Sequence, residues 1–148
     1  METFPLALDW MGSTAAAPHT RDALASAPGK PAIAVSAGAA YGGDPSRWNP
    51  EDLLGASLAQ CHMLTFLALA AKTRVDVRAY ADRPEVVLDT VDKVTRVTRI
   101  VLQPEIRVAG ELEPERLGAL FEKAHKYCFI GNSITAAVEL RPRFLAAE

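Results

Sequence analysis

The longest hydrophobic stretch of the chain lies between residues 50 and 72, and its ends carry helix signals. Asn49 is a good N-cap and Pro50 suits the first helical position. Glu51 and Asp52 place negative charge at the positive end of the helix dipole. Apolar residues cover most of the circumference, so we expect this long helix to be enclosed by other elements or by a second subunit.

The rest of the chain shows the alternation of apolar and polar residues that is typical of strands. We expect strands over residues 3–10 and 32–37, separated by a segment rich in small residues. From residue 74 to 110 the period is two, with Tyr80 on the polar side. Pro104 cannot donate to a strand ladder, so it predicts a bulge or an edge.

A second amphipathic helix is predicted from Glu113-Pro114, with Cys128 on its apolar stripe and Gly131 and Asn132 ending it. Residues 134–144 then supply a closing strand. The order β, β, long helix, β, β, β, helix, β predicts an α+β fold with a mainly antiparallel sheet. A length of 148 residues fits one domain, residues 1–148.

Composition narrows the function classes. The chain is 49% hydrophobic and 23% charged with a net charge of −2, so it offers no basic stripe for nucleic acid or anionic lipid. The first residues lack the pattern of a signal peptide, and polar side chains interrupt the long helix. We therefore expect a cytoplasmic protein in which that helix is a buried core helix.

The chain has two cysteines, Cys61 and Cys128, and each has a histidine close by. A lone free cysteine is more often a core residue than a catalyst. A reducing cytosol disfavours a permanent disulfide, so a pair of thiols there points to core, metal or redox roles. Nucleophilic chemistry at Cys61 needs a nearby cation to favour the thiolate, and the candidates are Arg21, Arg47, His62 and His125.

Two motifs give these cysteines a context. The sequence NPEDLL, at residues 49–54, precedes Cys61, which lies ten positions after Glu51, and the second helix ends in AHKYC at residues 124–128. Together they resemble the osmotically inducible protein C and organic hydroperoxide resistance (OsmC/Ohr) family. The resemblance runs from the GGD loop to the end of the chain. It implies an OsmC-like fold and an intertwined homodimer with neither metal nor prosthetic group.

The resemblance also implies an activity, a thiol-dependent peroxidase that prefers organic or lipid hydroperoxides. Cys61 matches the peroxidatic cysteine of the family, and Cys128 matches the resolving cysteine. Glu51 matches the glutamate that orients an arginine, for which Arg21 is the best match and Arg47 the alternative. A dithiol reductant, lipoyl or thioredoxin-like, would reopen the Cys61–Cys128 disulfide.

Helix geometry adds a constraint. Glu51 and Cys61 are ten residues apart, which is roughly 15 Å along a straight helix. They can serve one site only if a long arginine bridges them or if Glu51 acts from the partner subunit. We therefore predict shared sites at a dimer interface.

Other interpretations remain open. Phe129 follows Cys128 where the peroxide-resistance branch has proline, and CHML at residues 61–64 replaces the small or aromatic residues that more usually follow the first cysteine, so the subgroup and reductant are open. A redox sensor or binding protein with little turnover is one alternative. A zinc site of two cysteines and two histidines is another, although adjacent Cys61 and His62 point about 100° apart. As single residues, His62 and His125 are better explained as packed or hydrogen-bonded side chains than as acid-base catalysts.

Overall fold

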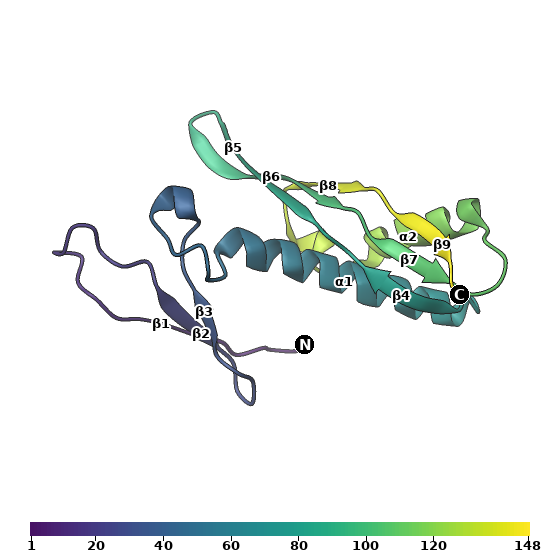
Figure 1. The fold of residues 1–148 in the computed structure, drawn as a ribbon, viewed down its shortest axis with the longest axis horizontal. Helices are drawn as coiled ribbons and strands as arrows, with labels where there is room; N and C mark the ends of the chain where they lie inside the picture. The colour runs from purple at the N-terminus through teal and green to yellow at the C-terminus, as the bar shows by residue number, and fades with distance from the viewer. The chain divides into compact units, whose positions relative to one another are not determined.

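The computed structural model describes residues 1–148. They form two compact units, residues 1–53 and residues 54–148. Figure 1 shows the helices and strands of each unit. The secondary structure is that of an α+β protein with two helices and three small sheets, where the sequence predicted one mainly antiparallel sheet.

The first unit contains a three-stranded antiparallel sheet. Its strands are β1 (Ala7–Trp10), β2 (Ala23–Ser26) and β3 (Ile33–Val35), with β2 in the centre. The short 3-10 helix η1 (Ala39–Tyr41) follows. Strand β2 lies in the small-residue segment, for which the sequence left a loop and a hairpin as alternatives. Its residues ALAS carry little strand propensity, and pairing with both neighbours defines the strand instead.

The long helix α1 spans Pro50–Lys72, as predicted. Its N-terminus is closed by a reciprocal pair of hydrogen bonds. The backbone N–H of Asp52 donates to Asn49 Oδ1 at 2.8 Å, and the backbone N–H of Asn49 donates to Asp52 Oδ2 at 3.1 Å. This capping box satisfies donors that a helix start leaves open.

The second unit contains two further sheets of three strands. One has the order β4 (Val77–Ala81), β7 (Glu105–Val108), β9 (Arg143–Ala146), and the other has the order β5 (Glu85–Val91), β6 (Val94–Leu102), β8 (Ala137–Leu140). The pairs β4–β7 and β5–β6 are antiparallel. The pairs β7–β9 and β6–β8 are parallel, which the sequence did not predict.

Pro104 and Pro142 each separate two strands where the sequence predicted one continuous strand. Pro104 is buried between β6 and β7, which belong to different sheets, so the predicted bulge or edge within one strand is wrong. Pro142 likewise separates β8 from β9, so the single closing strand is wrong as well. Proline lacks the N–H that a ladder needs, and the chain changes sheets at both positions. The carbonyl of Pro104 accepts a hydrogen bond from the Arg143 N–H at 2.8 Å, which joins the two crossings.

Helix α2 spans Pro114–Tyr127 and ends earlier than predicted. Cys128 is its C-cap residue, with an extended backbone at φ −68° and ψ 117°. The second 3-10 helix, η2 (Gly131–Ser133), follows within a few residues. Cys128 therefore lies in a turn between two helical segments and is not part of a continuous helix.

The alternation of apolar and polar residues predicted that Tyr80 lies on the polar face of its strand. A register shift makes this prediction wrong. The pairing of β4 with β7 is irregular between Val77 and Ala79, so the sides of the strand exchange. Tyr80 then pairs with the buried Ile106 and packs against the core, whereas Ala79 is exposed. Such a bulge leaves no clear signal in the hydrophobic pattern.

Helix α1 is covered on one face within its own unit. Its buried residues follow helical spacing: Gly55, Leu58, His62, Phe66 and Ala70. They pack with residues of α2 and the neighbouring sheets in two hydrophobic clusters. The opposite face is open in the single chain, and Leu64 is 55% exposed. The length and hydropathy of α1 would also suit a membrane span, and the packing of this one face buries 28% of its most apolar stretch.

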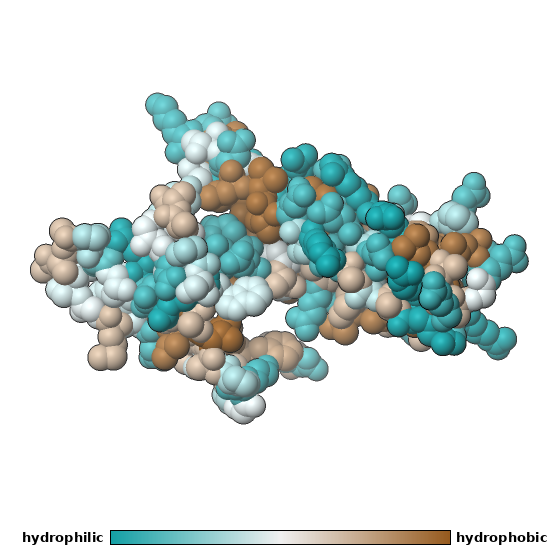
Figure 2. Space-filling model, viewed as in Figure 1, coloured by the Kyte–Doolittle hydropathy of each residue, from teal (hydrophilic) through white to brown (hydrophobic).

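Large apolar side chains remain at the surface of both units. In Figure 2 brown hydrophobic patches lie among teal hydrophilic residues. The most exposed of these side chains in the first unit are Met1, Phe4, Leu6, Leu8 and Met11, and in the second unit Phe129. Apolar surface gathered in patches is typical of a binding or subunit interface.

Candidate functional site

The second unit brings the two cysteines together. Cys128 is fully buried in a cluster with Leu58, Ile100 and Leu102, and Cys61 of α1 packs against the same cluster. Both are free thiols. Cys61 is half-buried, so it is the thiol that a molecule from solvent reaches first. A more accessible thiol with a buried thiol behind it is the arrangement that a two-step redox reaction requires.

The surroundings of Cys128 hold it in the thiol form. The pKa of Cys128 is raised to about 11, mainly by burial, and the neighbouring Cys61 contributes in the same direction. The backbone N–H of Gly131 acts in the opposite direction because it donates to Cys128 Sγ at 3.3 Å. A buried thiol of this kind is a weak nucleophile until its proton is removed.

Cys61 opens onto a groove beside α1 and α2. The groove has a volume of about 650 Å³. Apolar side chains form most of its wall, with two lysines at its edge: Leu64, Leu69, Tyr127, Phe129, Lys72 and Lys123. A largely apolar wall next to a thiol favours alkyl-bearing molecules over small polar ones.

The two neighbouring histidines form a stacked pair across α1 and α2. The ring centroids of His62 and His125 are 5.9 Å apart, with planes inclined by 24°. His62 also contacts Phe121, with centroids 4.3 Å apart. Burial, and secondarily His125, lowers the pKa of His62 to about 4, so this imidazole is neutral at neutral pH.

The sequence interpretation of the two histidines was that they are packed or hydrogen-bonded side chains. They are packed side chains, but both ring nitrogens of His62 and Nδ1 of His125 are buried without a hydrogen-bond partner. Their rings also stack on each other. No group of three or more histidine, cysteine, aspartate or glutamate side chains is arranged to hold a metal ion.

Two buried polar residues were missed by the sequence reasoning, Tyr80 and Asp82. The hydroxyl of Tyr80 and Oδ2 of Asp82 are buried and lack partners. Burial, Asp82 and then Cys128 raise the pKa of Tyr80 above its usual value. Burial also raises the pKa of Asp82, whose Oδ1 accepts a hydrogen bond from the Gln103 N–H at 2.9 Å. Only the register shift in β4 turns Tyr80 inward, so the sequence carried no usable signal for it.

Of the two candidate arginines, Arg47 is engaged in the structure of its own unit. Its guanidinium lies 3.6 Å from Asp22 and 3.7 Å from Asp44. Ser36 completes this network by donating to Asp22 at 2.9 Å and accepting the Asp44 N–H at 3.0 Å. Arg47 therefore stabilises the loop that precedes α1.

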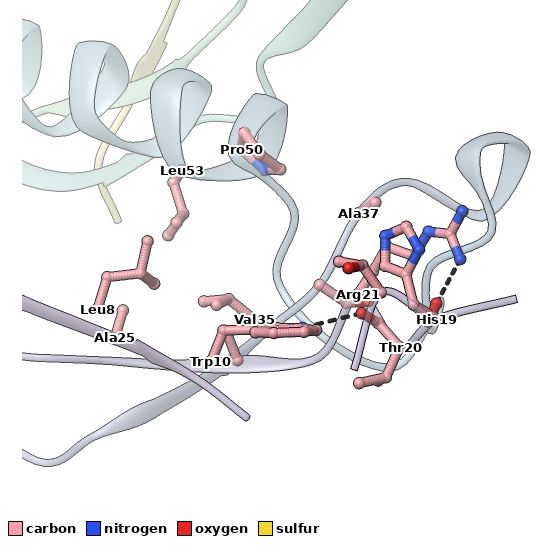
Figure 3. Close-up of a pocket in the computed structure, with 13 residues that line it drawn as sticks. Leu8, Trp10, His19, Thr20, Arg21, Ala25, Val35, Ala37, Pro50 and Leu53 are labelled. Atoms are coloured by element: carbon pink, nitrogen blue, oxygen red, sulfur yellow. Dashed lines mark hydrogen bonds between the residues drawn. The ribbon is translucent and has the colours of Figure 1, made fainter. Parts of the chain in front are cut away.

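Arg21 is free of carboxylate partners. Its guanidinium donates to the carbonyl of His19 and lies against Gly42, where a Cβ would be 3.4 Å from Arg21 Cζ. It lines a mainly apolar cavity of about 520 Å³ within the first unit (Figure 3). The other walls include Leu8, Trp10 and Val35. An unpaired guanidinium beside an apolar cavity remains available to an incoming anion.

Glu51 lies in the first turn of α1 and Cys61 in the middle of the same helix. Asp52, not Glu51, supplies the capping carboxylate, and no ion pair joins Glu51 to Arg21 or Arg47. The predicted site residues thus fall into two groups. Cys61 and Cys128 meet within residues 54–148, whereas Arg21 and Glu51 belong to residues 1–53.

The chain matches a known protein family. The family model for OsmC-like protein matches residues 43–143. The chain belongs to the OsmC-like protein family. An OsmC-like protein of unknown function from Vibrio cholerae has a matching solved structure, with a TM-score of 0.87 and 29% sequence identity over 96% of this chain and 99% of that one.

More distant OsmC-like relatives carry functional names. Peroxiredoxin OsmC of Escherichia coli is 26% identical over 62% of this chain and 64% of its own length. The chain thus matches less than two thirds of that curated relative. An organic hydroperoxide resistance protein of Legionella pneumophila shares the fold, with a TM-score of 0.71, 18% identity and 97% coverage of both chains.

Proposed function

We propose that this OsmC-like protein is a thiol-dependent peroxidase that reduces organic hydroperoxides to alcohols. The observation that carries the proposal is the pairing of a half-buried Cys61 on an apolar groove with a buried Cys128 behind it. The activity in the name of the Escherichia coli relative supports it from a distance.

In the first step, the thiolate of Cys61 attacks the distal oxygen of the hydroperoxide. The S–O bond forms as the O–O bond breaks, and the alkoxide leaves with a proton as the alcohol. Cys61 becomes a sulfenic acid. The apolar wall of the groove favours a substrate with an alkyl chain, because a buried CH₂ group contributes about 0.8 kcal/mol of binding free energy.

In the second step, Cys128 attacks the sulfenic sulfur. The S–S bond forms, the S–O bond breaks, and the hydroxyl group leaves as water. An external dithiol, lipoyl or thioredoxin-like, then exchanges with the Cys61–Cys128 disulfide and restores both thiols. A compartment that supplies such dithiols fits this cycle, and we place the protein in the cytoplasm.

Arg21 and Glu51 act in this proposal from a second copy of the chain. The guanidinium of Arg21 stabilises the Cys61 thiolate and the charge that develops on the peroxide oxygens, and Glu51 orients it. The exposed face of α1 and the exposed apolar residues of β1 are suited to bury each other in a homodimer. A dilute monomer with full activity would contradict this shared site.

A steady-state assay tests the peroxidase proposal. Cumene hydroperoxide is supplied with dithiothreitol or dihydrolipoamide, and alcohol formation is measured for the wild type, Cys61→Ser and Cys128→Ser. We expect turnover in the wild type, none in Cys61→Ser, and a single oxidation without disulfide in Cys128→Ser.

The same assay separates the peroxidase from a redox sensor. A wild type that forms the disulfide reversibly with one equivalent of peroxide, but does not turn over with any dithiol, would favour the sensor. A wild type whose Cys61 never reacts with cumene hydroperoxide would contradict both functions.

A further inference from the structure

The histidine pair next to the thiols is the buried titratable cluster that the two-step cycle leaves without a role. His125 lies one helical turn before Cys128, and its backbone carbonyl accepts the Cys128 N–H at 3.3 Å. Nδ1 of His125 is buried and has no partner while both cysteines are thiols. A buried nitrogen without a partner is destabilising, so an apolar ring would pack there more favourably.

Gly131 shows how close the imidazole of His125 is to the thiol of Cys128. A Cβ built on Gly131 would lie 3.5 Å from Cys128 Sγ and 3.6 Å from His125 Cε1. The sulfur and the imidazole therefore border the same small space above Gly131. Cε1 is bonded to both ring nitrogens, so the nitrogen-bearing edge of the imidazole faces this space.

The other groups around Cys128 cannot take its proton. The backbone N–H of Gly131 is a donor and already points at Sγ. Cys61 is the reaction partner and carries the sulfenic acid at this stage. Tyr80 is a phenol with a raised pKa, which makes it an acid that keeps its own proton at neutral pH. The imidazole of His125 borders the same space as Cys128 Sγ and can accept a proton at a ring nitrogen, so it is the acceptor that the geometry favours.

We propose that His125 accepts the thiol proton of Cys128, directly or through one water molecule, while the Cys61–Cys128 disulfide forms. This inference rests on the proposed function only for the origin of the sulfenic acid. His62 is a positioning residue in this scheme, because it stacks on the His125 ring and contacts Phe121 from the other helix.

The step balances in atoms and electrons. The S–H bond of Cys128 breaks, and its electron pair forms the S–S bond to Cys61 as the S–O bond breaks. The imidazole holds the proton between its departure from Cys128 and its arrival at the leaving hydroxide. Water is released, and His125 returns to its neutral state.

Two variants test the assignment from opposite sides. His125→Gln removes the base, and Gly131→Ala leaves it in place but fills the space between the imidazole and Cys128 Sγ. The new methyl of Gly131→Ala meets its neighbours at 3.4–3.6 Å, which is ordinary contact, so the fold should tolerate it. Glu122→Gln and Gly118→Ala are matched controls, because Glu122 is an exposed residue of the same helix and nothing lies within 4 Å of a Cβ at Gly118.

The experiment follows the two steps separately in a single turnover. Cys61 is oxidised by cumene hydroperoxide or, in parallel, by excess hydrogen peroxide, and samples are quenched by alkylation for mass spectrometry. We expect every variant to oxidise Cys61 at the wild-type rate. Disulfide formation should slow about tenfold or more in His125→Gln and in Gly131→Ala, since a positioned base contributes at least that much. The two controls should keep the wild-type rate.

Wild-type rates of disulfide formation in both His125→Gln and Gly131→Ala would overturn the assignment. Equal slowing of both steps in both variants would also overturn it, since that result indicates a structural role. Failure of cumene hydroperoxide alone to oxidise Cys61 would instead count against the proposed function. The hydrogen peroxide arm would then still decide the role of His125.

Discussion

The imidazole ring of His62 stacks on that of His125, so α1 and α2 are joined by a histidine contact as well as by the two cysteines. In the sequence each histidine belongs to a cysteine motif, Cys61-His62 and His125-x-x-Cys128. The packing that brings the thiols together therefore also buries the imidazoles.

The first prediction concerns stability at acidic pH. The pKa of His62 is about 4 in the folded protein and 6.5 in its ordinary state. Below pH 6.5 the unfolded chain binds a proton at His62 that the folded protein does not bind. The free energy of unfolding should therefore fall by about 3 kcal/mol between pH 6.5 and pH 4 on account of this residue.

Urea denaturation at pH 7 and pH 4.5 measures this loss. His62→Leu removes the titrating group but keeps a buried apolar side chain of similar size. The variant should lose clearly less stability than the wild type over this range, since other groups titrate equally in both. Parallel losses in the two proteins would show that His62 is not a source of the acid sensitivity.

The second prediction concerns the reactivity of the two thiols. Cys128 is fully buried and its pKa is raised to about 11, whereas Cys61 is half-buried on a groove. Iodoacetamide at pH 8 should alkylate Cys61 and leave Cys128 unmodified, because the thiolate is the reactive form. Peptide mass spectrometry after a short exposure measures both. Urea-unfolded protein, in which both cysteines react, is the control, and equal labelling in the native state would contradict the predicted order.

The third prediction compares two glycines in the two helices. A Cβ at Gly55 of α1 would lie 2.6 Å from Val86 Cγ2 of β5, whereas a Cβ at Gly118 of α2 meets nothing within 4 Å. Gly55→Ala should lower the free energy of unfolding by about 1–3 kcal/mol through overpacking. Gly118→Ala should raise it by about 0.5–1 kcal/mol, because alanine is the better helix former.

Thermal unfolding of the two variants checks this pair. Opposite shifts of Tm are expected from the same substitution. A stabilised Gly55→Ala protein would mean that Val86 moves aside at little cost, and would weaken the argument for tight packing of α1 on β5.

Local rules in the sequence predicted much of this fold. The bounds of α1 followed from NPED and the hydrophobic stretch, because capping and burial signals agree there. The β-sheets were less predictable, since strand partners depend on residues far apart in the chain. Pro104 and Pro142 marked breaks, but no local rule says that the chain changes sheets at them.

The sequence also predicted part of the candidate site, where the signals were local. Cys61 and Cys128 were identified from motifs, and the structure places them in one cluster. Tyr80 was placed on the wrong face because a single register shift reverses the alternation. Cys128 and His125 share the space above Gly131, and this arrangement depends on α2 ending at Tyr127. The helical pattern in the sequence predicted a longer helix.

The fourth prediction separates the two arginines. Arg47 is held by Asp22 and Asp44, while Arg21 has no carboxylate partner and borders an apolar cavity. Arg47→Gln should lower the free energy of unfolding by about 1 kcal/mol, because its ion pairs are partly exposed, and should leave the peroxidase rate nearly unchanged. Arg21→Gln should leave stability nearly unchanged and lower kcat/KM for cumene hydroperoxide on the order of a hundredfold.

Urea denaturation and steady-state kinetics on the same protein preparations decide between the arginines. Arg21→Lys is the informative intermediate, since lysine keeps the charge but lacks the planar fork, and it should recover only part of the lost rate. If Arg47→Gln instead abolishes activity in a protein of normal stability, then Arg47 must leave Asp22 and Asp44 to act at Cys61. That result would reverse the assignment of the activating arginine while leaving the roles of the two thiols intact.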